Sequence, residues 1–147
     1  MKSIIKASLL ILLSILLFTT CDNSVSLGSK VNTEKPVIKT PEDAENKPGD
    51  FLQGSSNEIW LDVVQEFGIA SVFMEVEYID VDTGKKARKR VEAVYDEVKK
   101  QWKVNLDTTK MQDGKITAWV TATDVDGNMT TTTDIIYTVK NTPPQIN

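Results

Sequence analysis

The amino-acid sequence predicts an all-β fold over residues 36–141, an antiparallel β-sandwich or barrel of about seven strands. Three observations predict it. Apolar residues alternate with polar ones along several short segments, turn residues such as Asp-Gly and Gly-Asn separate these segments, and no stretch of adequate length has the 3.6-residue period of an amphipathic helix. The chain has 147 residues, 40% of them hydrophobic and 26% charged, which is enough for one globular domain with additional terminal segments.

Residues 1–20 are predicted to be a signal peptide. Lys2 and Lys6 supply its positive charge, and the run from Ala7 to Phe18 is apolar apart from two serines. This run is too short to span a bilayer, which takes about 20 helical residues. The sequence therefore predicts export.

Cys21, the one cysteine of the chain, directly follows this segment. Its position resembles a loose form of the lipobox of bacterial lipoproteins. The resemblance implies that Cys21 becomes the mature N-terminus and carries acyl chains such as palmitate, which would anchor the protein to a membrane. The alternative is an ordinary exported protein with a free cysteine. We expect a location in the cell envelope, at the outer membrane or cell surface rather than the inner membrane.

Residues 21–35 are polar, rich in Ser and Asn and without a period, so they are predicted to form a flexible tether that begins at the lipidated Cys21. The domain is expected to begin with a short strand at Pro36–Ile38. A loop with Pro41, Pro48 and Gly49 follows.

The other strands are predicted from their alternation, at residues 51–54, 59–63, 72–79, 91–95, 102–106, 116–123 and 135–139. The segment Arg90–Val98 is the one candidate helix, and its alternation favours a strand or a pair of strands. The apolar residues expected to face the core include Ile59, Leu61, Val63, Val72, Met74, Val76, Tyr78, Val91, Ala93, Tyr95, Trp102, Val104, Leu106, Ile116, Ala118, Val120, Ala122, Ile135, Tyr137 and Val139.

The order of four motifs resembles that of a bacterial immunoglobulin-like domain: Pro36-Val37-Ile38, the run from Trp102 to Thr108, the turn Asp113-Gly114, and the run from Ala122 to Asn128. The resemblance implies an immunoglobulin-like sandwich over residues 36–141, with Trp102 in its core. Residues 142–147 are predicted to be a tail or the start of a further repeat, because Pro144 and Ile146 echo the first motif.

The composition excludes several kinds of chemistry. The chain has no histidine, which rules out Ser-His-Asp and Cys-His nucleophiles and histidine-containing zinc sites. Loss of Lys2 and Lys6 with residues 1–20 would lower the formal charge from −4 to −6, so a nucleic-acid partner is not expected. The carboxylates are scattered over turns, and we expect neither catalysis nor a cofactor.

Two acidic turns, Asp80 to Asp82 and Asp124 to Asn128, have alternate side chains that calcium could use as ligands. In the second turn Gly127 comes too early for a calcium loop, and no closing glutamate follows. The same residues are favoured in hairpin turns, so we predict turns and no metal site.

A basic run from Lys85 to Arg90 has two interpretations. It could bind an anionic polysaccharide or lipid headgroups. The favoured interpretation is a solvated loop or a charged edge strand, which prevents sheets from pairing between molecules.

The resemblance to an immunoglobulin-like sandwich implies that the strands at 72–79, 116–123 and 135–139 are neighbours, with 116–123 in the middle. Their outward-facing positions define a candidate binding face, formed by Phe73, Ile79, Trp119 and Ile136. Apolar surface of this kind marks interaction sites, for a protein or a polysaccharide. The alternative is that Arg90–Val98 or a loop folds over the face and makes it a second small core.

These observations predict a lipid-anchored envelope protein with an immunoglobulin-like binding or spacer module, non-catalytic, with a role in adhesion or surface interaction. The alternative is an accessory domain of an exported enzyme whose catalytic part lies beyond residue 147.

Overall fold

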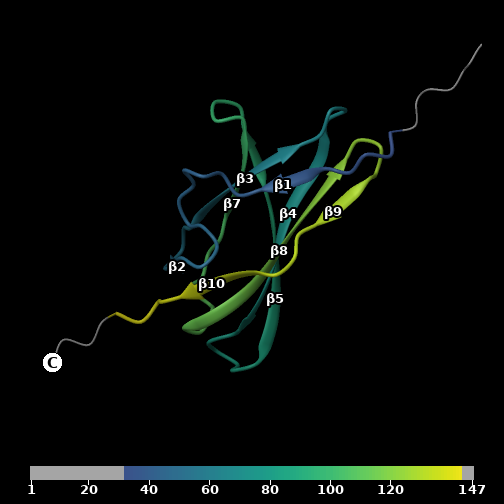
Figure 1. Ribbon diagram of the computed structural model, residues 1–147. Coiled ribbons are helices and arrows are strands. Elements are labelled where there is room, and N and C mark those ends of the chain that lie inside the picture. The colour runs from purple at the N-terminus through teal and green to yellow at the C-terminus, as the bar shows by residue number, and fades with distance from the viewer. Residues whose placement is uncertain (1–31, 144–147) are drawn as a thin grey trace, which may run out of the picture. The chain divides into compact units, whose positions relative to one another are not determined.

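Ten strands in two stacked sheets form the described part of the protein (Figure 1). The structure is a computed structural model that describes residues 32–143, so the signal peptide, Cys21, most of the tether and most of the tail lie outside the described residues. The strands are β1 (Val37–Lys39), β2 (Phe51–Leu52), β3 (Glu58–Val64), β4 (Ile69–Ile79), β5 (Lys86–Glu92), β6 (Val94–Asp96), β7 (Gln101–Asn105), β8 (Gly114–Asp124), β9 (Met129–Thr131) and β10 (Ile135–Val139).

The strand order confirms the predicted immunoglobulin-like sandwich. The smaller sheet has the order β1-β3-β7-β6, and the larger one has the order β2-β10-β8-β4-β5 with β9 also paired to β8. An immunoglobulin domain has its first, second, fifth and fourth strands in one sheet and its third, sixth and seventh in the other. All pairings are antiparallel except the short parallel pair of β2 and β10.

Chain segments that change sheets account for the ten strands where about seven were expected. The predicted strand over residues 91–95 divides at Ala93, so that β5 is the edge of the larger sheet and β6 the edge of the smaller one. On the opposite side of the sandwich, β1 is the edge of the smaller sheet and β2 is the edge of the larger one. The last strand divides into β9 and β10, which pair with successive parts of β8.

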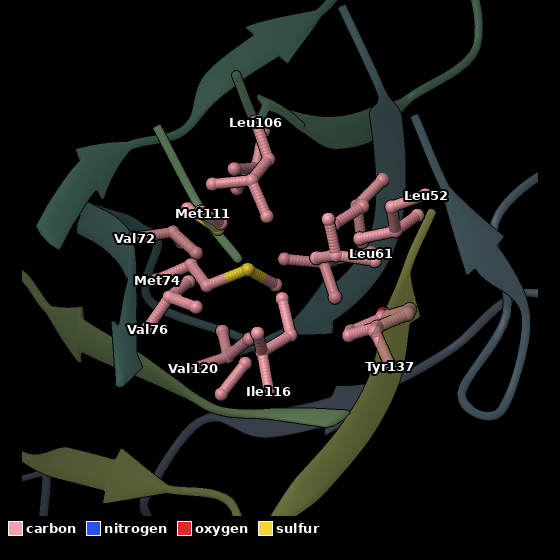
Figure 2. Packing of buried hydrophobic residues seen from close by; sticks show 14 of the residues in the cluster. Leu52, Leu61, Val72, Met74, Val76, Leu106, Met111, Ile116, Val120 and Tyr137 are labelled. Atoms are coloured by element: carbon pink, nitrogen blue, oxygen red, sulfur yellow. The ribbon is translucent and has the colours of Figure 1, made fainter. Parts of the chain in front are cut away.

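The core lies between the sheets and consists of the side chains that the alternation places inward. Figure 2 shows the Met74 side chain in the middle of this core. Leu61 of β3 and Leu106, which directly follows β7, lie on one side of it, and Ile116 and Val120 of β8 lie on the other. Burying these side chains contributes roughly 25 cal/mol per Å² of apolar area removed from water. The packing supplies stability without a disulfide between the sheets.

Three aromatic residues differ from a simple alternation. Trp60 is on the outer side of β3 and is nevertheless only 5% exposed. The ammonium groups of Lys99 and Lys103 lie over its ring, 3.7 Å and 5.2 Å from the ring centre. Trp102 and Tyr95 are on the inner side of the smaller sheet, but near its edge, so both are partly exposed.

The core also includes a residue outside the strands. Met111, which follows β7 in a loop, is buried there.

Candidate functional site

The outer face of the larger sheet carries all four residues of the candidate binding face. Phe73 and Ile79 are on β4, Trp119 is on β8 and Ile136 is on β10. As expected, β8 lies between β4 and β10. The segment that could have folded over this face does not do so, because β5 pairs beside β4 and β6 belongs to the other sheet.

Trp119 is at the centre of this face. Its indole Nε1 donates a hydrogen bond of 2.7 Å to Asp134 Oδ1, just before β10. Glu75 is opposite it on β4, and Thr117 and Thr121 flank it along β8. The ring is half-buried and held in one orientation by its hydrogen bond.

Strand register places three of the four residues on one diagonal. Phe73 of β4 is opposite Thr121, which comes two residues after Trp119 on β8. Ile136 of β10 is opposite Thr117, which comes two residues before Trp119. Ile79 lies off this diagonal, across from Lys86 near the β4–β5 turn. Threonines and charged residues separate the apolar side chains, so the face is mixed in character.

Basic side chains of β5 lie against the aromatic rings of this face. The Arg90 guanidinium carbon is 3.5 Å from the centre of the Phe73 ring, and that of Arg88 is 5.4 Å from the centre of the Trp119 ring. A cation over an aromatic face is attracted by the ring quadrupole. The basic run and the candidate binding face, which the sequence presented as separate features, therefore form one surface.

Glu77 on β4 connects two of these cations. Its carboxylate accepts hydrogen bonds from Lys86 Nζ at 3.0 Å and from Arg88 Nη2 at 3.0 Å. The hydrogen bond from Lys86, followed by that from Arg88, holds the pKa of Glu77 below its usual value. Lys86 and Arg88 are 76% and 66% exposed, so these ion pairs are weak and can exchange partners with a ligand.

The basic run forms a charged edge strand, as favoured from the sequence. At one end of the ladder formed by β4 and β5, the backbone N–H of Asp80 donates to the carbonyl oxygen of Lys85. At the other end, the backbone N–H of Ala93 donates to the carbonyl oxygen of Val72. Because hydrogen-bonded pairs alternate along an antiparallel ladder, the backbone groups of Lys86, Arg88 and Arg90 point away from β4, to the free edge.

The two acidic turns have the geometry of turns. Asp80 Oδ1 accepts hydrogen bonds from the backbone N–H and the hydroxyl of Thr83, and Asp82 pairs with Lys110 at 2.7 Å. Within residues 32–143 no three acidic or cysteine side chains are placed to hold a metal ion.

Asp124 has a structural role that the sequence did not reveal. Its buried carboxylate accepts five hydrogen bonds, from the backbone N–H groups of Asp126 and Asn128 and from the side-chain amides of Asn32, Gln65 and Asn128. Burial alone raises the pKa of Asp124, but the hydrogen bonds from Asn128, Asp126 and Gln65 outweigh it and hold the pKa below its usual value. Asp124 thereby joins the start of the domain to both sheets.

Asn141 has the corresponding role at the other end of the domain. Its side chain accepts from Gly54 N–H and the Thr108 hydroxyl, and donates to the carbonyl oxygens of Thr108 and Met111. The backbone N–H of Asn141 also donates to Asp113, beside the start of β8. Both the beginning and the end of the described chain are therefore fixed to the sandwich.

A hollow of about 410 Å³ lies at one end of the sandwich. Val63, Gln65, Gly68, Ile69, Tyr95 and Trp102 line it, and the last two rings are 5.3 Å apart and tilted by 56°. The alternation of Tyr95 and Trp102 predicts core positions for both rings, so this hollow was not predictable from the sequence.

In the part of the chain that the structure describes, there is no helix long and apolar enough to cross a membrane.

Comparisons with known proteins support the fold and go no further. No family model and no curated protein matches the chain. Among solved structures, an endo-β-1,4-mannanase from Thermotoga petrophila is similar over 76% of this chain, with 14% identity and a TM-score of 0.52. The similarity covers 21% of that mannanase chain. The CopC protein from Methylosinus trichosporium is similar over 68% of this chain and 91% of its own, with 17% identity and a TM-score of 0.40.

Proposed function

We propose that the protein is a lipid-anchored, non-catalytic protein of the cell envelope, in which the immunoglobulin-like domain is a rigid spacer that presents a binding face away from the membrane. Cys21 is the anchor in this proposal, and the residues between Cys21 and Asn32 are the tether, since Asn32 is already bonded to the domain. Export and acylation are supported by the sequence of residues 1–21 alone.

The observation that carries the spacer role is where the chain enters and leaves the domain. Asn32 is bonded to Asp124 and Asn128 at the end of β8, and Asn141 lies beside Asp113 at its start. β8 has 11 residues, which at roughly 3.3 Å each separates the two points by about 33 Å. Figure 1 shows the described chain beginning and ending at opposite ends of the sandwich. Such a domain holds the segments before and after it apart by the full length of the sandwich.

A metabolic labelling experiment tests the anchor. Cells that express the chain are grown with a clickable fatty acid, and the protein is isolated and examined for label. We expect label on the wild-type chain and none on Cys21→Ala. Equal labelling of both would disprove the anchor.

A domain replacement tests the spacer. An epitope tag is placed after Asn147, and its accessibility to antibody on intact cells is compared between the wild type and a chain without residues 36–141. We expect accessibility to fall on deletion and to be restored by an unrelated β-sandwich of similar length. Unchanged accessibility on deletion would exclude a spacer role.

The second candidate is an accessory domain of an exported enzyme. The fold similarity to a fifth of a mannanase chain is compatible with it. The reading frame after residue 147 distinguishes the two, because a long segment rich in histidine and clustered acids would favour the enzyme.

A further inference from the structure

We propose that the outer face of the larger sheet binds an acidic polysaccharide, with sugar rings stacked on Trp119 and carboxylates paired with Lys86, Arg88 and Arg90. The inference rests on the binding face of the proposed function and names its ligand class, whereas the anchor and the spacer role have separate tests.

The first step is the fixed aromatic platform. Trp119 is half-exposed, and the hydrogen bond from its Nε1 to Asp134 orients the ring. Thr117, beside Trp119 on β8, offers a hydroxyl group next to the ring, whereas the Thr121 hydroxyl is buried and bonded to that of Thr131. A flat ring surrounded by hydroxyl and carboxylate groups suits a sugar, which has an apolar C–H surface and a rim of hydroxyl groups.

The second step is a row of cations beside that platform. Lys86, Arg88 and Arg90 all face outward on β5, and alternate residues of a strand are roughly 7 Å apart. Arg88 reaches the Trp119 ring itself. The row therefore runs along the platform and provides several positive charges for a chain that carries a negative charge on successive units.

The third step is the charge distribution, which distinguishes an acidic polysaccharide from other anions. Five of the six residues from Lys85 to Arg90 are basic, in a chain whose formal charge is −4. The carboxylates Glu75, Glu77, Glu92 and Asp134 lie on the same face, with Glu92 paired to Arg90 at 2.7 Å, and they would repel the dense charge of a nucleic acid or polyphosphate. A chain with one carboxylate per sugar is less densely charged and can replace Glu77 at Lys86 and Arg88.

Binding of polygalacturonate tests the proposal directly. The full-length chain is purified in a neutral detergent, and its Kd is measured for oligomeric polygalacturonate and for the same oligomer with its carboxylates methyl-esterified. We expect the acidic form to bind at least tenfold more tightly, and the difference to shrink as salt is raised.

Matched variants locate the site. Lys86→Ala/Arg88→Ala is expected to weaken binding at least tenfold, whereas Lys35→Ala/Lys39→Ala, which removes the same charge at β1, stays within twofold of the wild type. Trp119→Thr is expected to lose binding to a similar extent, and Trp119→Phe to retain most of it. The melting temperature of each variant shows whether it is folded. If Trp119→Thr is not folded, the binding of Trp119→Phe and of Lys86→Ala/Arg88→Ala tests the site.

Several results would overturn the proposal: equal binding of the esterified oligomer, no effect of Lys86→Ala/Arg88→Ala, or no saturable binding. Equally tight binding of polyphosphate or of a thymidine oligonucleotide would also overturn it, because the face would then be a general binder of anions.

Discussion

At the scale of single residues, the buried carboxylate of Asp124 is the most highly connected polar group of the described chain. All five of its hydrogen-bond donors are amides, and they come from the start of the domain, from the end of β3 and from its own turn. An asparagine at this position would place an N–H₂ group against some of these donors, and a buried donor left unsatisfied is costly.

We therefore expect Asp124→Asn to lower the melting temperature by several degrees at neutral pH. The pKa of Asp124 is lowered in the folded state. Its contribution to the stability of the fold is therefore fully present above the ordinary pKa of an aspartate, and it is lost as the pH falls through the folded pKa. The difference between wild type and variant should thus shrink in acid. Melting curves at a series of pH values measure it, with the exposed Asp126→Asn as the control. A constant difference at all pH values would contradict this role.

Trp119 and Met74 are neighbours across the larger sheet that face opposite sides of it. Met74 is fully buried at the centre of the core, so Met74→Ala is expected to cost about 2–5 kcal/mol. Trp119→Ala removes a half-exposed ring and one hydrogen bond, and is expected to cost about 1–2 kcal/mol. Urea unfolding of both variants measures the two losses. A loss at Trp119 as large as that at Met74 would show that the ring belongs to a core.

At the scale of the elements, alternation predicted the long strands well because each has one face on the core. β4 and β8 have their buried residues at the expected positions. The same reasoning could not predict that the polypeptide would cross from one sheet to the other at Ala93, because inward and outward parity says nothing about which sheet a residue belongs to.

The candidate binding face and its cations were predictable only in parts. The parity of β4, β8 and β10 identified Phe73, Trp119 and Ile136, but the approach of Arg88 and Arg90 depends on β5 being their neighbour, which local sequence does not specify. Trp60 shows the same limit, since Lys99 and Lys103, which lie over its ring, are distant from it in sequence. The five partners of Asp124 are likewise a result of tertiary structure.

β5 leads to a prediction about association. The backbone groups of Lys86, Arg88 and Arg90 are at a free sheet edge, and their charges oppose pairing with another molecule. Replacing all three by valine should make the protein associate, measured by light scattering during concentration. Valine at Thr117, in the central strand β8, is the control and should have no such effect. A triple variant that stays monomeric would show that the charges do not protect this edge.

At the scale of the whole molecule, the core alone should hold the fold together. The carboxylates of Asp80, Asp82 and Asp124 in these turns are engaged with protein groups, so we expect the melting temperature to be the same with calcium and with EDTA. Ligand binding worth about 1 kcal/mol would shift the transition by roughly 4–8 °C in a domain of this size. A shift of that size would mean that one of the turns binds calcium.

The most direct test of the account is the distance between the two ends of the domain. Spin labels at Thr33→Cys and Thr142→Cys, in a chain with Cys21→Ala, report this distance by electron–electron double resonance. Because β8 separates the two ends by about 33 Å, the account predicts a single narrow distribution centred at roughly 30–40 Å. A distribution centred below about 20 Å, or one too broad to have a centre, would contradict a rigid spacer with its ends at opposite poles.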